Sequence, residues 1–416
     1  MGIFIGFCIL LALDLYAFAG IKIIVSQYPN LVRNAIHVGY WVLSLSLPLL
    51  FILNPEDFRR PSSGINVMVI LANFWMIFGI SKLIFIVSLF GEDIFRVVYA
   101  LFQKINGTDG LAESFLPSRR KFVGQTALVL ASLPFLSLTY GLVKGRYQFK
   151  IHRKKLFFKD LPEAFDGFTI TQLSDVHAGS LDSQEEVSKA MEMVKSLNSD
   201  VIVFTGDLVN TFAGEFDPWA HHFKGLSAAH GKFSVLGNHD YGHYHRWENE
   251  FDKHKNFQNL LAHHDQTGFK LLRDECHVIR KEGQEIHLLG VENWGLGFGR
   301  IGNLDKALEQ SVPGAFRVLL SHDPTHWEYV VKDHKEKVHL TMCGHTHGMQ
   351  MGIELPGFKW SPIQYKYPRW SDLHQVSDRF LYINRGFGVL GYRGRVGIWP
   401  EITQITLHRG DPTQNA

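Results

Sequence analysis

Hydrophobic and polar residues follow different patterns in the two halves of the chain. Four long apolar stretches dominate the first 145 residues. Each approaches or exceeds the roughly 18–20 residues that an α-helix needs to cross the core of a bilayer. Four such runs in succession disfavour the alternative, buried helices of a soluble domain. The pattern predicts an all-α transmembrane bundle of about four helices over residues 1–145, with spans at 3–25, 36–53, 67–90 and 122–143.

A second pattern begins after a basic linker at residues 146–160. Over residues 161–416, short β-rich runs alternate with helical segments, one of them around residues 185–197. Apolar strands punctuated by helices predict an α/β core with sheets buried between helical layers. A chain of 416 residues, 46% of them hydrophobic, also implies more than one domain. The expected strands are 168–175, 200–207, 232–240, 285–293, 316–323, 338–347, 380–384 and 401–407.

Few charged residues lie inside the apolar stretches. Lys22 is near a helix end and can extend to the membrane surface. Asp14 and Lys82 lie deeper; they either pair with each other inside the bundle or sit at the interface of a shifted span. A transport path would need more polar positions, so the domain is interpreted mainly as an anchor. Residues 94–105 are expected to form a separate interfacial helix.

Charge and composition narrow the functional classes. The formal net charge of +2 gives no reason to propose nucleic-acid binding. Three scattered cysteines suggest neither a disulfide framework nor a cysteine-rich zinc site. The 22 histidines, most of them between residues 177 and 408, favour metal binding instead.

The basic residues that flank the spans predict an orientation. With the N-terminus inside, eight lie on the inner side and six on the outer side. The positive-inside rule then predicts a multi-pass protein of the cell membrane whose soluble half is cytoplasmic. The inner set is Arg59, Arg60, Lys144, Arg146, Lys150, Arg153, Lys154 and Lys155, and the outer set is Arg33, Arg96, Lys104, Arg119, Arg120 and Lys121.

Side chains able to bind metals follow five of the predicted strands, at the point where each strand ends. Loops at the carboxyl ends of strands are where α/β sheets build their sites. In GHTHG, residues 344–348, alternation along an extended chain places both imidazoles on one face, at a spacing that suits one histidine per metal. DVH, GDLVN and SHDP are less specific, because each also fits a simple turn. The candidates are Asp175, His177, Asp207, Asn238, His239, His322, His345 and His347.

The order D-x-H, G-D, G-N-H-D, a lone histidine and G-H-x-H resembles the calcineurin-like metallophosphoesterase superfamily, over residues 168–407. The motifs SDVHAG, TGDLVN, GNHD, GVENW, SHDP, GHTHG and NRGFG…PEITQITL are similar to its YkuE- and YaeI-like branch, here with an N-terminal multi-span membrane anchor. The resemblance implies an α/β fold, a two-sheet β-sandwich flanked by helices, with a dinuclear metal centre at one edge.

The resemblance also implies two sets of ligands that share Asp207 as a bridging carboxylate. Mixed oxygen and imidazole ligands suit two divalent ions of manganese, iron or zinc. One ion would be bound by Asp175, His177, Asp207 and His347, and the other by Asp207, Asn238, His322 and His345.

The catalytic residues implied by the resemblance are His239 and Asp240. Two ions about 3.5–4 Å apart would activate a metal-bridging hydroxide and clamp the phosphate for in-line attack. His239 would bind the phosphate and protonate the leaving oxygen. Asp240 would orient that imidazole, or it caps a turn; the sequence leaves both roles open.

The predicted function is therefore that of a membrane-anchored metal-dependent hydrolase, a phosphoesterase. Its substrate would be a phosphodiester, phosphomonoester or pyrophosphate in a phosphorylated small molecule or in a lipid-linked molecule such as UDP-diacylglucosamine. Two alternatives are a ligand-binding sensor or transporter with a non-catalytic phosphoesterase-like domain, and a protein phosphatase.

Other residues near the motifs have less certain roles. Cys343 is left out of the ligand set, because the seven ligands already complete the coordination of both metals. Met349 is expected to form an apolar wall beside the leaving group. Four arginines are either ligands of a second phosphate or structural residues, namely Arg300, Arg385, Arg393 and Arg395.

Overall fold

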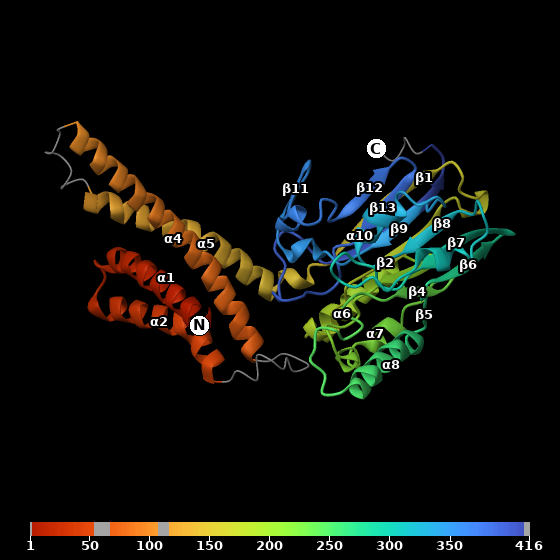
Figure 1. Cartoon of the computed structure of the whole chain (residues 1–416), viewed down its shortest axis with the longest axis horizontal. Coiled ribbons are helices and arrows are strands. Elements are labelled where there is room, and N and C mark those ends of the chain that lie inside the picture. The colour runs from red at the N-terminus through yellow and green to blue at the C-terminus, as the bar shows by residue number, and fades with distance from the viewer. Residues whose placement is uncertain (1, 54–66, 107–115, 412–416) are drawn as a thin grey trace. The chain divides into compact units, whose positions relative to one another are not determined.

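The computed structural model describes residues 2–53, 67–106 and 116–411. The chain divides into two compact units, with the division between Tyr140 and Gly141 (Figure 1). We call them the helical unit and the α/β unit and describe each by itself.

The helical unit contains four long helices. Three apolar segments are long enough to cross a membrane, Ile5–Val25, Met68–Ile105 and Arg120–Val143. The fourth predicted span, residues 36–53, lies in a 24-residue helix, and its membrane crossing stays a prediction. The helices are α1 (Gly2–Val25), α2 (Asn30–Leu53), α4 (Val67–Ile105) and α5 (Leu116–Val143).

Helix α4 differs from the sequence-based expectation. A separate interfacial helix at residues 94–105 was wrong, because α4 continues unbroken for 39 residues, about 58 Å at 1.5 Å per residue. A single helical glycine, here Gly91, costs only about 1 kcal/mol relative to alanine. Just beyond it, Arg96 lies 3.9 Å from Glu92 and 3.5 Å from Asp93, and charge pairs at this spacing favour the helix.

The two deep charges of the helical unit form a buried pair. Lys82 Nζ lies 2.5 Å from Asp14 Oδ1. The hydroxyls of Tyr40 and Ser44 donate to the same oxygen at 3.0 and 2.9 Å. Of the two placements left open by the sequence, the structure has the paired one, and the carboxylate is satisfied within the bundle.

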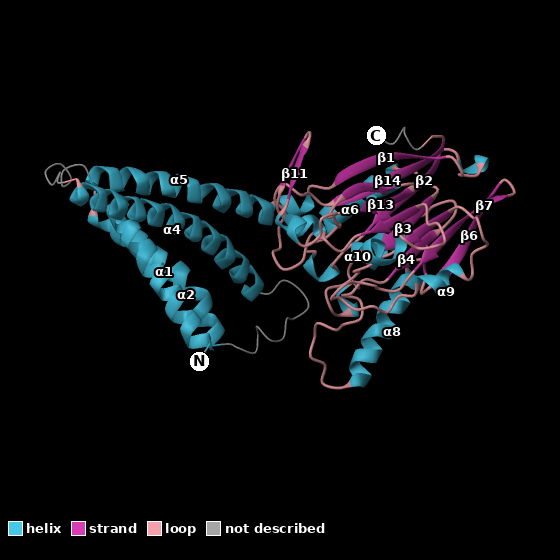
Figure 2. Cartoon of the chain, turned by 45° about the horizontal axis from the view of Figure 1, so that its top comes forward, coloured by secondary structure: helices cyan, strands magenta, loops and turns pink. Residues whose placement is uncertain are grey.

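The α/β unit is built on two six-stranded mixed sheets (Figure 2). The first has the order β1-β14-β2-β3-β4-β5 and the second β12-β13-β9-β8-β7-β6, with a separate β10–β11 hairpin. The first sheet comprises β1 (Lys150–Phe158), β2 (Phe168–Leu173), β3 (Val201–Thr205), β4 (Lys232–Val235), β5 (Phe269–Leu271) and β14 (Glu401–Arg409). The second comprises β6 (Glu275–Lys281), β7 (Gln284–Gly290), β8 (Arg317–Leu320), β9 (Leu340–Cys343), β12 (Asp372–Val376) and β13 (Arg379–Ile383), and the hairpin β10 (Ile353–Leu355) and β11 (Phe358–Trp360).

Helices cover the outer faces of both sheets. The longer ones begin at side-chain caps, since Ser183 accepts from Glu186 N before α6 and Asn249 accepts from Asp252 N before α8. The helices are α6 (Gln184–Ser196), α7 (Ala220–Lys224), α8 (Glu250–Gln266), α9 (Leu304–Leu308) and α10 (Pro324–His326). The short helical turns are η1 (Gly145–Tyr147), η2 (Glu163–Phe165), η3 (Ala178–Ser180), η4 (Ala213–Glu215), η5 (Trp327–Val331), η6 (His347–Gln350) and η7 (Pro362–Tyr365).

Successive residues of a strand point to opposite faces of the sheet, so the hydrophobic core of the α/β unit consists of separate layers. Val203 faces the cluster between the sheets, together with Leu288 and Val318 of the second sheet. Its neighbour Phe204 points the other way, into the cluster formed with α6, α7 and α8. A third cluster lies between the second sheet and α9 and η5 and includes Trp327. The predicted α/β sandwich of two sheets flanked by helices is confirmed.

Parallel pairing brings the strand ends together at one edge. Strands β2, β3 and β4 are mutually parallel, as are β7, β8 and β9, so within each set the carboxyl ends meet. The Gln172 amide joins the two sheets there, because it donates to Cys343 O at 2.9 Å and to Thr205 Oγ1 at 2.8 Å. The loops that follow these strands therefore share one edge of the sandwich.

Candidate metal centre

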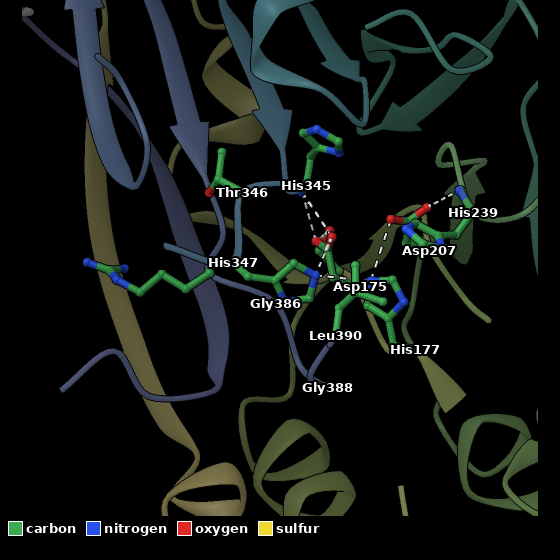
Figure 3. A network of polar contacts seen from close by, with 12 residues as sticks. Asp175, His177, Asp207, His239, His345, Thr346, His347, Gly386, Gly388 and Leu390 are labelled. Atoms are coloured by element: carbon green, nitrogen blue, oxygen red, sulfur yellow. Dashed lines mark hydrogen bonds and ion pairs between the residues drawn. The ribbon is translucent and has the colours of Figure 1, made fainter. Parts of the chain in front are cut away.

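The structure gathers six of the seven predicted ligands into two groups at this edge. In the first group (Figure 3), His177 Nε2 lies 3.0 Å from His347 Nε2, and Asp175 Oδ1 lies 3.3 Å from that same His347 atom. The second group is Asp207, His322 and His345. In both, the ligand atoms lie within 4.8 Å of one another, as a bound metal ion requires.

Asp207 lies between the two groups. Its Oδ2 is 3.1 Å from His322 Nε2 of its own group and 3.6 Å from His177 Nε2 of the other. One carboxylate oxygen thus faces imidazoles on both sides, the position that a bridging ligand would occupy.

The backbone is strained where these side chains turn into the site. Left-handed φ values occur at five of the seven predicted ligands, a conformation that costs non-glycine residues free energy and is concentrated at functional sites. The angles are 51° at Asp175, 44° at His177, 58° at Asp207, 70° at His345 and 50° at His347.

Two glycines allow the loops to approach the carboxylates closely. A Cβ on Gly237 would lie 2.2 Å from Asp207 Oδ1, and one on Gly344 would lie 2.1 Å from Asp175 Oδ2. Both distances are below any van der Waals contact. The glycines of GNHD and GHTHG therefore make room for the ligand carboxylates themselves.

Unpaired lone pairs show that the site fits a cation. His322 Nδ1 lies 2.7 Å from Thr205 O, and since a carbonyl can only accept, Nδ1 is the donor. His322 Nε2 lies 3.1 Å from Asp207 Oδ2 and 3.2 Å from His345 Nδ1, and a positive charge at this point, either a proton on Nε2 or a metal ion, would balance the carboxylate. Asn238 provides the same indication: its Nδ2 donates to Tyr244, while its buried Oδ1 has no hydrogen-bond partner among the described residues.

Burial and charge set the protonation of the ligands. Burial lowers the pKa of His177 and that of His345, which favours the neutral, ligating imidazole. Burial opposes ionisation of Asp207, but the imidazoles of His322 and His239 hold its pKa well below the usual value. Cys343 lies in the hydrophobic cluster between the second sheet, α9 and η5, and burial there raises the pKa of its thiol well above normal.

His239 borders the site beside Asp207. Its backbone N–H donates to Asp207 Oδ1 at 2.8 Å, and its Nδ1 donates to Asn210 O at 2.7 Å. With Nδ1 committed to a carbonyl, Nε2 is the atom that can accept or release a proton. Asn210 also contacts His177 Nδ1 through its side chain at 3.1 Å, so a residue of TGDLVN that the sequence analysis did not single out positions two imidazoles.

Of the two roles left open for Asp240, the structure has the one in which its carboxylate binds backbone N–H groups. Its carboxylate accepts the backbone N–H groups of Asp207, Gly237 and Leu208 at 2.8–2.9 Å, and it is fully buried. The carbonyl of Asn210, not Asp240, orients the His239 ring. The alternative that Asp240 orients His239 does not hold, and the carboxylate instead joins the loops after β3 and β4, whose backbone N–H groups have no strand partner there.

The four arginines that the sequence left as phosphate ligands or structural residues make mainly structural contacts. Arg385 is fully buried and paired with Glu401 at 2.5 Å. Arg395, also buried, donates to the carbonyls of residues 385, 386 and 388. Arg300 lies over the ring of Trp294, and Arg393 donates to Gly179 O.

A cavity of about 170 Å³ opens beside the second ligand group. Lys366 and Tyr367, which the sequence did not identify, line it; the Tyr367 hydroxyl is 2.9 Å from His345 Nε2, and Lys366 Nζ is 4.5 Å from the ring centre of Phe298. Met349, the predicted apolar wall, is half exposed and is not among the described residues around the cavity. The lining is Asp207, Asn238, His239, Phe298, His345, Thr346, Ile363, Lys366, Tyr367 and Leu390.

Two His/Asp ligand groups that meet at one carboxylate, beside a cavity at the edge of a two-sheet sandwich, define a metal-dependent hydrolase. Family comparison gives the same result for both halves. Residues 168–349 match the calcineurin-like phosphoesterase family, and residues 1–146 match the family described as a probable calcineurin-like phosphoesterase transmembrane domain. The chain belongs to the calcineurin-like metallophosphoesterases and carries an N-terminal transmembrane domain.

Similar proteins occur in bacteria and animals. The chain is 28% identical to the uncharacterized metallophosphoesterase YkuE of Bacillus subtilis, over 59% of this chain and 81% of that protein. It is 27% identical to the phosphodiesterase YaeI of Escherichia coli, over 70% and 99%. It is also 27% identical to a transmembrane protein with metallophosphoesterase domain of Danio rerio, over 68% of this chain but only 62% of that protein.

Proposed function

We propose that this membrane-anchored metallophosphoesterase hydrolyses a phosphoester or pyrophosphate bond in a lipid-linked substrate, for example a molecule of the UDP-diacylglucosamine type. The observation that carries the proposal is the pair of ligand groups meeting at Asp207 beside a cavity, in a chain with three apolar spans. A multi-span anchor supports a substrate in the same bilayer, because tethering raises the local concentration of enzyme and lipid.

The proposed ligand sets follow the two groups. Asp175, His177, Asp207 and His347 would bind one divalent ion, and Asp207, Asn238, His322 and His345 the other; manganese, iron and zinc all accept such ligands. Bound there, the ions would polarise the phosphoryl oxygens and lower the pKa of the attacking water. Asn238 contributes the unpaired Oδ1 described above, a neutral donor that limits negative charge.

His239 is proposed as the general acid. Its Nε2 would donate a proton to the leaving oxygen, while the bond from Nδ1 to Asn210 O keeps the ring in place. Asp240 would act through the backbone, since its bonds to the N–H groups of Asp207 and Gly237 keep the two loops in register.

Lys366 is proposed to bind the phosphate or a second phosphate of the substrate. It is a cation that lines the same cavity as Asp207, and Ile363 and Leu390, which also line the cavity, would contact apolar parts of the substrate. We also propose a cytoplasmic location for the α/β unit, on the basis of the eight basic residues against six counted above.

The experiment is a substrate panel with the full-length protein in micelles. Phospholipids, nucleotide-linked lipids and phosphopeptides are each incubated with the protein and manganese, and release of the product is measured. We expect hydrolysis of a lipid-linked phosphoester and its loss in Asp207→Asn. Turnover of phosphopeptides alone would instead identify a protein phosphatase, and no turnover of any substrate would favour a binding or sensing role.

A further inference from the structure

The β10–β11 hairpin has one polar and one apolar face. In its antiparallel register Glu354 is opposite Lys359, whereas Ile353 is opposite Trp360 and Leu355 is opposite Phe358. Because opposite residues of an antiparallel pair point to the same side, the first pair forms one face and the four apolar residues form the other.

The polar face attaches the hairpin to the α/β unit. Glu354 Oε1 lies 2.7 Å from Arg385 Nη2, and Lys359 Nζ lies 3.1 Å from the same Glu354 oxygen. Lys359 also pairs with Asp372. These bonds fix the hairpin's orientation, which an isolated two-stranded hairpin would not maintain in water.

The apolar face is exposed. Ile353 is 46% exposed, Leu355 59% and Phe358 53%, and none of the three belongs to a described hydrophobic cluster of the unit. The hairpin stands apart from the two large sheets in both views (Figure 1, Figure 2). A contiguous apolar surface of this kind, held outward by ion pairs, marks a contact with another molecule or a membrane.

Both ends of the hairpin are connected to the metal centre. The strand β10 follows His347 by a few residues, and Ser361, directly after β11, donates to Gly348 O at 2.8 Å. The chain then forms the cavity wall that includes Ile363 and Tyr367. Whatever the hairpin contacts is therefore close to the mouth of the site.

The base of the hairpin also lies next to the end of a membrane span. Gly352 N donates to Val396 O at 2.9 Å, and Val396 N donates to Gln350 O at 2.8 Å. The neighbouring Arg395 N donates to Gly141 O at 3.2 Å, in the last turn of α5, whose apolar segment ends at Val143. One short loop thus contacts both the hairpin base and the last turn of α5.

We propose that the apolar face of the β10–β11 hairpin lies in the interfacial layer of the bilayer that α5 crosses. Phenylalanine, leucine and tryptophan are typical of residues that insert at this depth. In this position the hairpin holds the mouth of the metal site at headgroup level, so that a lipid-linked phosphate enters without leaving the membrane. Only this last consequence rests on the proposed function.

The contact is tested with the full-length protein in nanodiscs of phosphatidylcholine and phosphatidylglycerol. A nitrobenzoxadiazole probe is attached to Phe358→Cys in a chain carrying Cys8→Ser and Cys276→Ser, and quenching by lipids spin-labelled near the headgroup is measured. The matched control is Phe251→Cys on α8, because Phe251 is 74% exposed in the same unit. We expect about 3-fold stronger quenching at position 358 than at 251, as for an interfacial segment. Equal, weak quenching at both positions would overturn the proposal.

Activity gives a second, separate readout. Leu355→Ser with Phe358→Ser is compared with Phe251→Ser on a lipid phosphoester embedded in the nanodisc and on bis(p-nitrophenyl) phosphate in solution. We expect about 10-fold lower turnover of the embedded substrate and less than about 2-fold change for the soluble one. Equal losses on both would contradict the proposed role in access. If the wild-type protein hydrolyses only the soluble ester, the lipid-substrate proposal fails while the quenching result still decides the membrane contact.

Discussion

Both units of the chain bury carboxylates, but the partners of those carboxylates differ. In the helical unit, the Asp14 carboxylate pairs with Lys82 and accepts hydrogen bonds from the hydroxyls of Tyr40 and Ser44. Protein groups therefore satisfy both its charge and its lone pairs. In the α/β unit, Asp207 Oδ2 lies between the Nε2 atoms of His322 and His177, and the nearby Asn238 Oδ1 has no hydrogen-bond partner among the described residues. Since buried polar groups are normally satisfied, the first arrangement explains stability, and the second leaves an acceptor that a bound cation would satisfy.

The largest expected effect separates these two carboxylates directly. Asp207→Asn should lower hydrolysis of bis(p-nitrophenyl) phosphate by at least about 10³-fold, because both ligand groups lose the shared anionic oxygen. Asp14→Asn should leave this activity within about 2-fold, since no described residue of the helical unit belongs to either ligand group. Steady-state kinetics in detergent micelles measure both variants. Similar activities of the Asp207→Asn and Asp14→Asn proteins would contradict a catalytic role for Asp207 alone.

The next prediction concerns whether His239 of the α/β unit acts as a general acid or only binds the substrate. His239→Ala should lower kcat about 10²-fold for an alkyl phosphodiester, as expected for loss of a general acid. The loss should be smaller for a nitrophenyl ester, whose leaving group needs no proton. The control is His243→Ala, an exposed residue outside the cavity lining. Equal losses for good and poor leaving groups would assign His239 a binding role only.

A substitution of Lys82 tests whether the buried charge pair of the helical unit stabilises that unit. Lys82→Met leaves Asp14 buried without its cation and should destabilise the helical unit by roughly 2 kcal/mol. The double variant with Asp14→Asn should recover part of this loss. Unfolding of the full-length protein in mixed micelles, followed by circular dichroism, gives both values. Unchanged stability of the single variant would show that the pair is dispensable.

Lys366 has the smallest expected effect. Lys366→Met should raise KM about 5-fold with little change in kcat, because an exposed cation adds phosphate affinity but does not touch the ligands. Lys306→Met, on α9 and outside the cavity, should change neither constant. A fall in kcat without a change in KM would instead show that Lys366 stabilises the transition state of hydrolysis.

The sequence predicted the parts of the site that local pattern determines. Asp175, Asp207 and His345 directly follow apolar strands, and the structure brings these residues together because parallel strands end at one edge. The two-sheet sandwich follows from the same alternation of strands and helices.

Features set by distant contacts were missed. The turn-capping role of Asp240 was one of the two alternatives, but its bonds to backbone donors 32 and 33 residues away, after another strand, were not predicted. Tyr367 reaches His345 from a loop without any motif, and nothing in its neighbours indicates the cavity. The continuity of α4 was missed for another reason, since the one-sided apolar pattern of residues 94–105 fits an interfacial helix and the last turns of a longer helix equally well.

The central claim is that the α/β unit binds two divalent ions through ligands that meet at Asp207. The most direct test is the metal content of the full-length protein, purified in detergent and equilibrated with manganese, then measured by inductively coupled plasma mass spectrometry. We expect about two ions per chain in the wild type and at most about one in Asp207→Asn, with the Asp14→Asn protein unchanged. A wild-type chain that binds no ion, or an Asp207→Asn chain that still binds two, would contradict it.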